Sequence, residues 1–116
     1  MIKNKGGLGV RVRGFNYERK IAIEFRKMGW HDCVTARAES RNEDSKNIDL
    51  CFTSPFNIQC KCKNNFGNPL PILLEMPQDE NYNIVFSKVV SKGEFITMSK
   101  DDFYELVQML KVNKIM

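Results

Sequence analysis

Three polar residues stand at positions where they could form a hydrolytic site. Asp49 lies in a run of alternating polar and apolar residues, and Gln59 and Lys61 lie in a second such run. A turn at residues 53–55 brings Asp49 opposite Gln59 or its neighbour, so the polar faces of two strands gather all three side chains. Carboxylate and amide oxygens are ligands that Mg²⁺ prefers, and a nearby ammonium group stabilises negative charge developing on a phosphate. The pattern indicates metal-assisted hydrolysis of a phosphodiester.

A second carboxylate comes from a helix that we expect over residues 16–28. Asn16 is suited to its N-cap and Gly29 to the position just past its end. At 100° per residue, Glu18 falls in the middle of the apolar stripe of this helix. Because burial of an unpaired carboxylate is costly, Glu18 is expected at the edge of a cleft or beside a cation.

The remaining elements must position these side chains. Alternation and turn residues predict a strand at 33–37, a polar loop at 38–46, a hairpin of strands 48–53 and 56–62, a short helix at 70–76, strands at 83–90 and 94–98, and a last helix capped by Ser99. The apolar stripe of the last helix is expected in the core: Phe103, Leu106, Val107 and Leu110. This order predicts an α/β sandwich with a mixed central sheet. Residues 14–116 form one domain, and residues 1–13 form a flexible basic arm.

Charge and cysteine content bound the partners and the compartment. Among the 116 residues, positions 1–41 hold ten Lys/Arg and four Asp/Glu, a balance of +6, and positions 42–116 hold eight and ten, a balance of −2. A basic first third favours a polyanion such as nucleic acid. No apolar run is long enough to span a membrane, and no export signal is visible. The four cysteines include no Cys-x-x-Cys pair, so reduced thiols in the cytoplasm are expected rather than a zinc site.

The order and spacing of these motifs resembles the PD-(D/E)XK nuclease superfamily over about residues 14–110. Within it, the chain is similar to archaeal-type Holliday junction resolvases and to related short phage endonucleases. The residues that carry the resemblance are Gly14-Phe15-Asn16-Tyr17-Glu18-Arg19, Gly29-Trp30, Arg37 with Ser40, Ile48-Asp49-Leu50, Ile58-Gln59-Cys60-Lys61, Ile96-Thr97-Met98 and Ser99-Lys100-Asp101-Asp102-Phe103.

The resemblance implies a restriction-endonuclease-like sandwich of order αβββαββα and a Mg²⁺-dependent endodeoxyribonuclease, with Mn²⁺ as a substitute. Asp49 would be the central metal ligand, Glu18 and Gln59 further ligands, and Lys61 the catalytic lysine. Branched DNA as substrate, a homodimer and a phage-encoded protein acting in the host cytoplasm are also implied. The expected DNA contacts are Lys3, Lys5, Arg11, Arg13, Arg19, Arg37, Ser40, Arg41 and Lys63.

Gln59 departs from the superfamily pattern, which has Glu or Asp at this position. The amide keeps one oxygen ligand but loses a charge, so the affinity for the metal should fall. One alternative is that Glu75 reaches in from the following helix. Others are a nuclease of the same fold with another substrate, a DNA-binding protein with weakened or no catalysis, and a zinc-stabilised interaction module.

Overall fold

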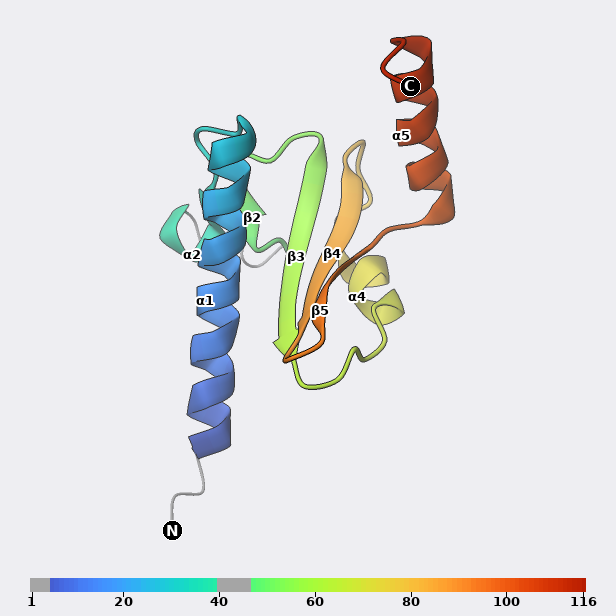
Figure 1. Ribbon diagram of the computed structural model, residues 1–116. Helices are drawn as coiled ribbons and strands as arrows, with labels where there is room; N and C mark the ends of the chain where they lie inside the picture. The colour runs from blue at the N-terminus through green and yellow to red at the C-terminus, as the bar shows by residue number, and fades with distance from the viewer. Residues whose placement is uncertain (1–4, 40–46) are drawn as a thin grey trace.

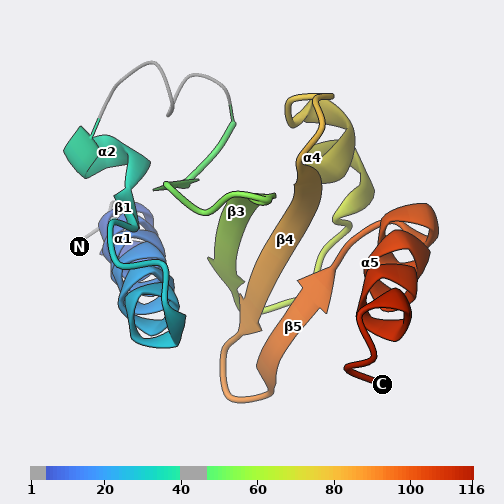
Figure 2. The same cartoon turned by 90° about the horizontal axis from the view of Figure 1, so that it is seen from above.

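The computed structural model describes residues 5–39 and 47–116 and has a mixed α/β architecture (Figure 1). A three-stranded sheet lies between helix α1 on one side and helices α4 and α5 on the other (Figure 2). The elements, in chain order, are α1 (Lys5–Met28), β1 (Val34–Thr35), α2 (Ala36–Glu39), β2 (Leu50–Cys51), β3 (Phe56–Lys63), α4 (Leu70–Glu75), β4 (Tyr82–Val89), β5 (Gly93–Thr97) and α5 (Lys100–Val112).

The sheet has the order β3-β4-β5 and is mixed, as the sequence predicts. The predicted hairpin of strands 48–53 and 56–62 is wrong for the described residues, because β2 pairs with β1 in a separate ladder and β3 pairs with β4. Strand β3 pairs with β4 in parallel, in a register that joins Lys61 to Ser87. Strand β5 pairs with β4 antiparallel, in a register that joins Ser87 to Phe95. Parallel neighbours need a crossover, and α4 lies in the segment that makes it.

The core lies between α1 and the sheet. Of the predicted stripe of α1, Tyr17, Ile21, Ala22 and Phe25 are each at most 6 % exposed, whereas Met28, at the end of the helix, is 62 % exposed and not part of the core. The four buried residues pack in one cluster with residues of β3 and its surroundings, namely Cys33, Leu50, Ile58, Cys60 and Cys62. The apolar side of β3 therefore faces α1, and its polar residues at alternate positions face the other way.

Helix α1 is longer than the sequence predicts. It begins at Lys5 rather than near Asn16, so residues 5–13 are helical and the prediction of a flexible arm over that range is wrong. Glycines weaken a helix by about 1 kcal/mol each but do not break it as proline does, and each added residue gains a backbone hydrogen bond. Within the part of the chain that the structure describes, no helix is long and apolar enough to cross a membrane.

The strands that precede β3 are shorter than predicted. Val34 and Thr35 pair with Leu50 and Cys51 as a separate two-stranded ladder, and residues 36–39 turn into helix α2 instead of continuing the strand. Strand β2 ends where Phe52 adopts a left-handed backbone conformation with φ of 63°, which also exposes 56 % of its side chain. The predicted alternation therefore stops at that residue.

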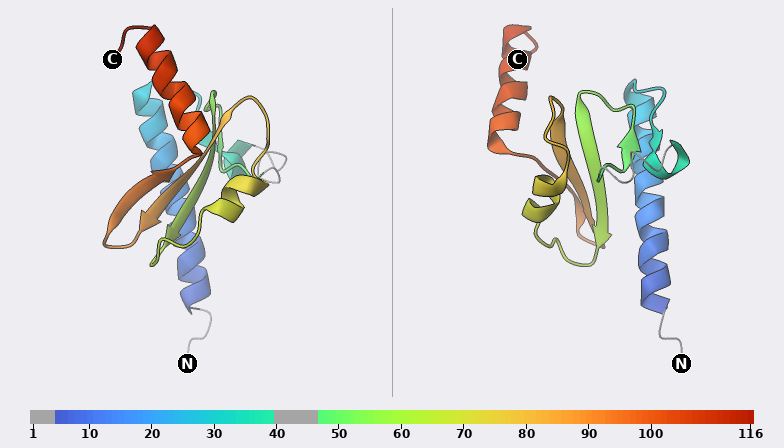
Figure 3. Two further views of the ribbon diagram at one scale, coloured as in Figure 1. Left: turned by 90° about the vertical axis from the view of Figure 1, so that its right-hand side faces the viewer. Right: turned by 180° about the vertical axis from the view of Figure 1, so that it is seen from behind.

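Helix α5 begins as predicted, because the Ser99 hydroxyl accepts a hydrogen bond from the Asp102 N–H at 3.1 Å. The prediction that its stripe is core is wrong, since none of its residues is buried and Phe103 is 52 % exposed. The helix contacts the domain through Met109, whose sulfur accepts from the Tyr82 hydroxyl, and Met109 lies about 120° around the helix from Phe103. Because α1 and α5 both extend past the sheet, the molecule measures 59 × 28 × 26 Å (Figure 3).

Candidate active site at the edge of strand β3

Asp49 is tied to strand β3 by two hydrogen bonds. Its backbone N–H donates to the Ile58 carbonyl at 2.8 Å, and its Oδ2 accepts from the Cys60 N–H at 2.7 Å. The carboxylate thus accepts the hydrogen bond that a backbone carbonyl of a neighbouring strand would accept, at the edge of β3 away from β4. Cys60 lies between Gln59 and Lys61, so these contacts place the Asp49 carboxylate against the stretch of β3 backbone that joins the two residues.

Gln59 and Lys61 occupy alternate positions on β3, on the side opposite the core cysteines. Gln59 is 8 % exposed, whereas Lys61 is half-buried. Their neighbours on β4 are Val85 and Ser87. The lysine thus combines a fixed backbone position with access to solvent, as a residue that meets a large substrate requires.

Glu18 approaches the same part of β3 from helix α1. It is only 5 % exposed, and its Oε1 accepts from the Nε of Arg37 at 3.3 Å. Arg37 comes from helix α2, and its guanidinium lies 4.1 Å from the centroid of the Phe15 ring. The cation that a buried carboxylate needs is therefore Arg37, which the sequence assigned to DNA binding.

The pKa of the Cys60 thiol is influenced by the charges of Asp49, Glu18 and Lys61. Burial raises its pKa well above 9.0, the Asp49 and Glu18 carboxylates raise it further, and the Lys61 ammonium lowers it. The thiol stays protonated at neutral pH, because all but one of these influences oppose the thiolate.

The oxygen donors suit a hard cation. Among residues 5–39 and 47–116, no group of three or more His, Cys, Asp or Glu side chains is placed to hold a metal. Carboxylate and amide oxygens fit Mg²⁺ better than Zn²⁺. The structure places Asp49 at the edge of β3, Gln59 on the side of β3 away from α1, and Glu18 on α1 at the cysteine side, so it does not bring the Glu18 and Gln59 side chains onto one face. Glu75, at the end of α4, is exposed, and its backbone carbonyl accepts from the Asn47 side chain at 3.1 Å. The end of α4 therefore lies next to the segment that enters β2.

The basic residues expected to contact DNA are distributed along α1 and the end of β3. Arg11 and Lys63 are exposed, and Arg13 donates to the Asn64 side chain at 3.4 Å, which joins the two elements. Arg19 is exposed and donates to Asn16 on its own helix. The remaining positions, Lys3, Ser40, Arg41 and the side chain of Lys5, lie outside the part that the structure describes.

Sequence reasoning missed a groove at the end of β3, because residues 63–69 read only as a loop. The groove occupies about 430 Å³ and is lined by Asn64, Asn65, Phe66, Val89, Lys92 and Phe95. We call it the aromatic groove, since the Phe66 and Phe95 rings meet in it with centroids 5.9 Å apart. The sequence signal for the groove was Phe66, a large apolar residue within the loop sequence Asn64-Asn65-Phe66-Gly67.

Family models, curated proteins and solved structures were all compared with this chain, and none of them matches it.

Proposed function

We propose that the chain is a divalent-metal-dependent DNA endonuclease with a restriction-endonuclease-like sandwich, acting on branched DNA such as a Holliday junction. The observation that carries the proposal is the 2.7 Å hydrogen bond from the Cys60 N–H to Asp49 Oδ2. It joins a carboxylate from the segment just before β2 to the strand that bears Gln59 and Lys61. Glu18, buried on helix α1, brings a second carboxylate near Cys60.

Each residue has a distinct role in this proposal. Asp49, Glu18 and Gln59 would hold Mg²⁺, or Mn²⁺ in its place, through their side-chain oxygens. When bound, the cation supplies positive charge to the scissile phosphate. Lys61, which is half-buried on β3, would stabilise the charge that develops on the phosphate in the transition state. Gln59 contributes no charge, so we expect the cation to bind more weakly than at three carboxylates.

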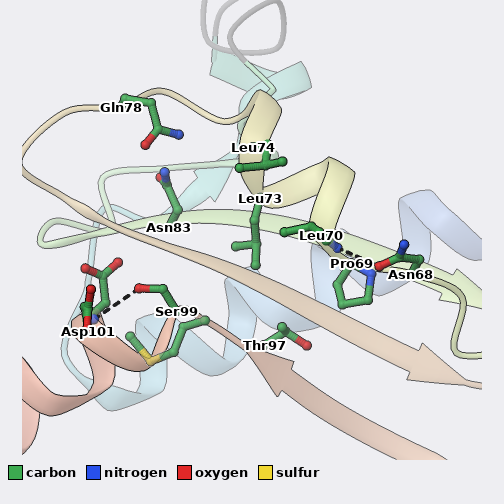
Figure 4. A pocket seen from close by; sticks show the side chains of 12 residues that line it. Asn68, Pro69, Leu70, Leu73, Leu74, Gln78, Asn83, Thr97, Ser99 and Asp101 are labelled. Carbon is green, nitrogen blue, oxygen red and sulfur yellow. Dashed lines mark hydrogen bonds between the residues drawn. The ribbon is translucent and has the colours of Figure 1, made fainter.

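The proposal includes a homodimer, supported by unpartnered apolar side chains on the side of the sheet away from α1. A groove of about 520 Å³ runs between α4 and the start of α5, with Leu70, Leu73 and Leu74 on one wall (Figure 4). Leu70 and Leu74 are more than half exposed, as are Phe103 and Tyr104. The two half-exposed aromatic rings alone offer about 200 Å² of surface. With the two leucines, the exposed apolar area of this face is roughly half of the 800 Å² or so that each partner buries in a specific interface, so its polar rim would supply the rest.

A second candidate function is DNA binding without cleavage, and two contacts favour it. Arg37 already satisfies the charge of Glu18, so a cation would compete with a guanidinium for that carboxylate. Gln59 replaces an acid with a neutral group. A chain with this site could hold branched DNA through its basic surface while the site itself stays inactive.

Cleavage of a labelled four-way junction separates these functions. The junction is incubated beside a linear duplex and a single strand, with Mg²⁺, Mn²⁺ or EDTA. Wild type is compared with Lys61→Ala and with a matched control, Lys111→Ala, which removes an exposed lysine from α5. Paired, metal-dependent cuts in the junction only, lost in Lys61→Ala and kept in the control, are the expected result. Cutting of all three DNAs would mean a general nuclease, and tight junction binding without cuts would favour the binding function.

A further inference from the structure

The aromatic groove has the features of a binding site rather than of core packing. Phe66 and Phe95 are each 45 % exposed, and their rings meet nearly at right angles, with 83° between their planes. An edge-to-face pair leaves ring faces open on both residues. The groove lies at the end of the sheet where β3 stops and where β4 turns into β5 (Figures 1 and 3). Two large rings left half in solvent beside a groove favour a planar ligand.

The groove lies on the same side of the sheet as Lys61. Lys61 pairs with Ser87 across β3 and β4, and Ser87 pairs with Phe95 across β4 and β5. Cross-strand partners project from the same side of a sheet, so the three side chains form one row. Strands lie about 4.8 Å apart, which puts the backbone of Phe95 about 10 Å from that of Lys61. A ligand in the groove therefore lies next to the candidate active site.

The charge around the groove suits an anionic chain. Lys92 lines it, and Lys63 ends the adjacent strand. Arg13 reaches its rim through the hydrogen bond to Asn64. None of the residues that line the groove is acidic, and the neighbouring carboxylate of Glu94 is already paired with Lys20 at 2.7 Å.

We infer that the aromatic groove binds an unpaired nucleobase of a DNA strand, stacked on Phe66 or Phe95, with the flanking phosphates near Lys63 and Lys92. Stacking on an aromatic ring beside a basic groove is how proteins hold single-stranded nucleic acid without reading its sequence. The asparagine amides can meet the polar edge of a base, whereas an apolar peptide would leave them unpaired. The inference rests on the proposed DNA substrate and narrows it to DNA in which bases near the cut are unpaired.

Binding in EDTA tests the groove separately from cleavage. The probe is a single-stranded oligonucleotide that carries 2-aminopurine, whose fluorescence is quenched by stacking, beside the same sequence as a duplex. The full-length chain is compared with Phe66→Leu and Phe95→Leu, which keep apolar volume but remove the ring. Phe52→Leu, which removes a ring that is 56 % exposed and does not line the groove, is the matched control. Unchanged urea unfolding curves establish that each variant is folded.

We expect Phe66→Leu or Phe95→Leu to weaken single-strand binding about tenfold and to remove the quenching, with duplex binding changed less than twofold. The control should bind like wild type. Equal losses for single strand and duplex, or no loss in either groove variant, would overturn the inference. Binding is measured in EDTA and cleavage in Mg²⁺, so the two proposals can fail separately. If wild type cleaves the junction but Phe66→Leu binds the single strand normally, the groove is rejected and the nuclease function is kept. If Phe66→Leu weakens single-strand binding but wild type does not cleave in Mg²⁺, the groove is kept and the nuclease function is rejected.

Discussion

Substitution of Asp49 separates a structural role from a catalytic one. Its Oδ2 is the acceptor for the Cys60 N–H, so Asp49→Ala leaves a backbone donor of β3 without this partner. The lost bond should lower the free energy of unfolding by about 1–3 kcal/mol. Asp49→Asn can keep an oxygen at the same place and loses only the charge, so its cost should be about 1 kcal/mol or less.

Urea unfolding measures the first effect, and a loss of about 2 kcal/mol moves the midpoint by about 1 M for a protein of this size. Junction cleavage in Mg²⁺ measures the second. If the carboxylate holds the cation, Asp49→Asn should be nearly as stable as wild type and yet cleave at least about 100-fold more slowly. Wild-type cleavage by Asp49→Asn would refute the metal role. If Asp49→Ala and Asp49→Asn lowered the free energy of unfolding equally, loss of the hydrogen bond to Cys60 could not explain the destabilisation.

Three further results are expected. Ile58→Ala, at a side chain that is 0 % exposed, should lower the free energy of unfolding by about 3 kcal/mol in urea, and a loss under 1 kcal/mol would mean that the core between α1 and β3 is loose. If the proposed homodimer forms through the exposed face of α5, Phe103→Glu should convert it to a monomer in sedimentation experiments without loss of helical circular dichroism, whereas an unchanged mass would place the interface elsewhere. The hydrogen bond from Lys20 holds the pKa of Glu94 below its usual 4.5, so this contribution to stability is present above about pH 4.5 and is lost as the pH falls through the folded-state pKa. Glu94→Gln should therefore unfold with a flatter pH dependence below pH 4.5, and an unchanged profile would show that the ion pair is not formed in solution.

Elements whose pattern and end signals agree are well predicted from the sequence. The C-terminal half of α1 has a continuous apolar stripe, α4 lies between Pro69 and Pro77, and the turn at residues 91–93 joins β4 to β5. In each case the periodicity and the residues at the ends indicate the same structure. Of the candidate site residues, these elements carry Glu18, on α1.

The rest depends on contacts that no local pattern contains. Strand β2 is only two residues long, and the contact of Asp49 with β3 uses its side chain as well as its backbone N–H, which no strand pattern indicates. The partner of Glu18 is Arg37, nineteen positions along the chain, and nothing near either residue indicates that they meet. Periodicity also shows that one side of α5 is apolar, but not whether another part of the same chain covers it.

Helix α1 sets a spacing as well as a position. It runs without interruption from Lys5 to Met28, so Arg11 and Glu18 belong to one rigid rod rather than to an arm and a domain. Seven residues of helix separate them by about 10 Å along the axis. Consecutive phosphates advance about 3.4 Å along a duplex strand, so this interval corresponds to about three nucleotides. If Arg11 binds a phosphate of the proposed DNA substrate, the cut would fall at a constant number of nucleotides from that phosphate.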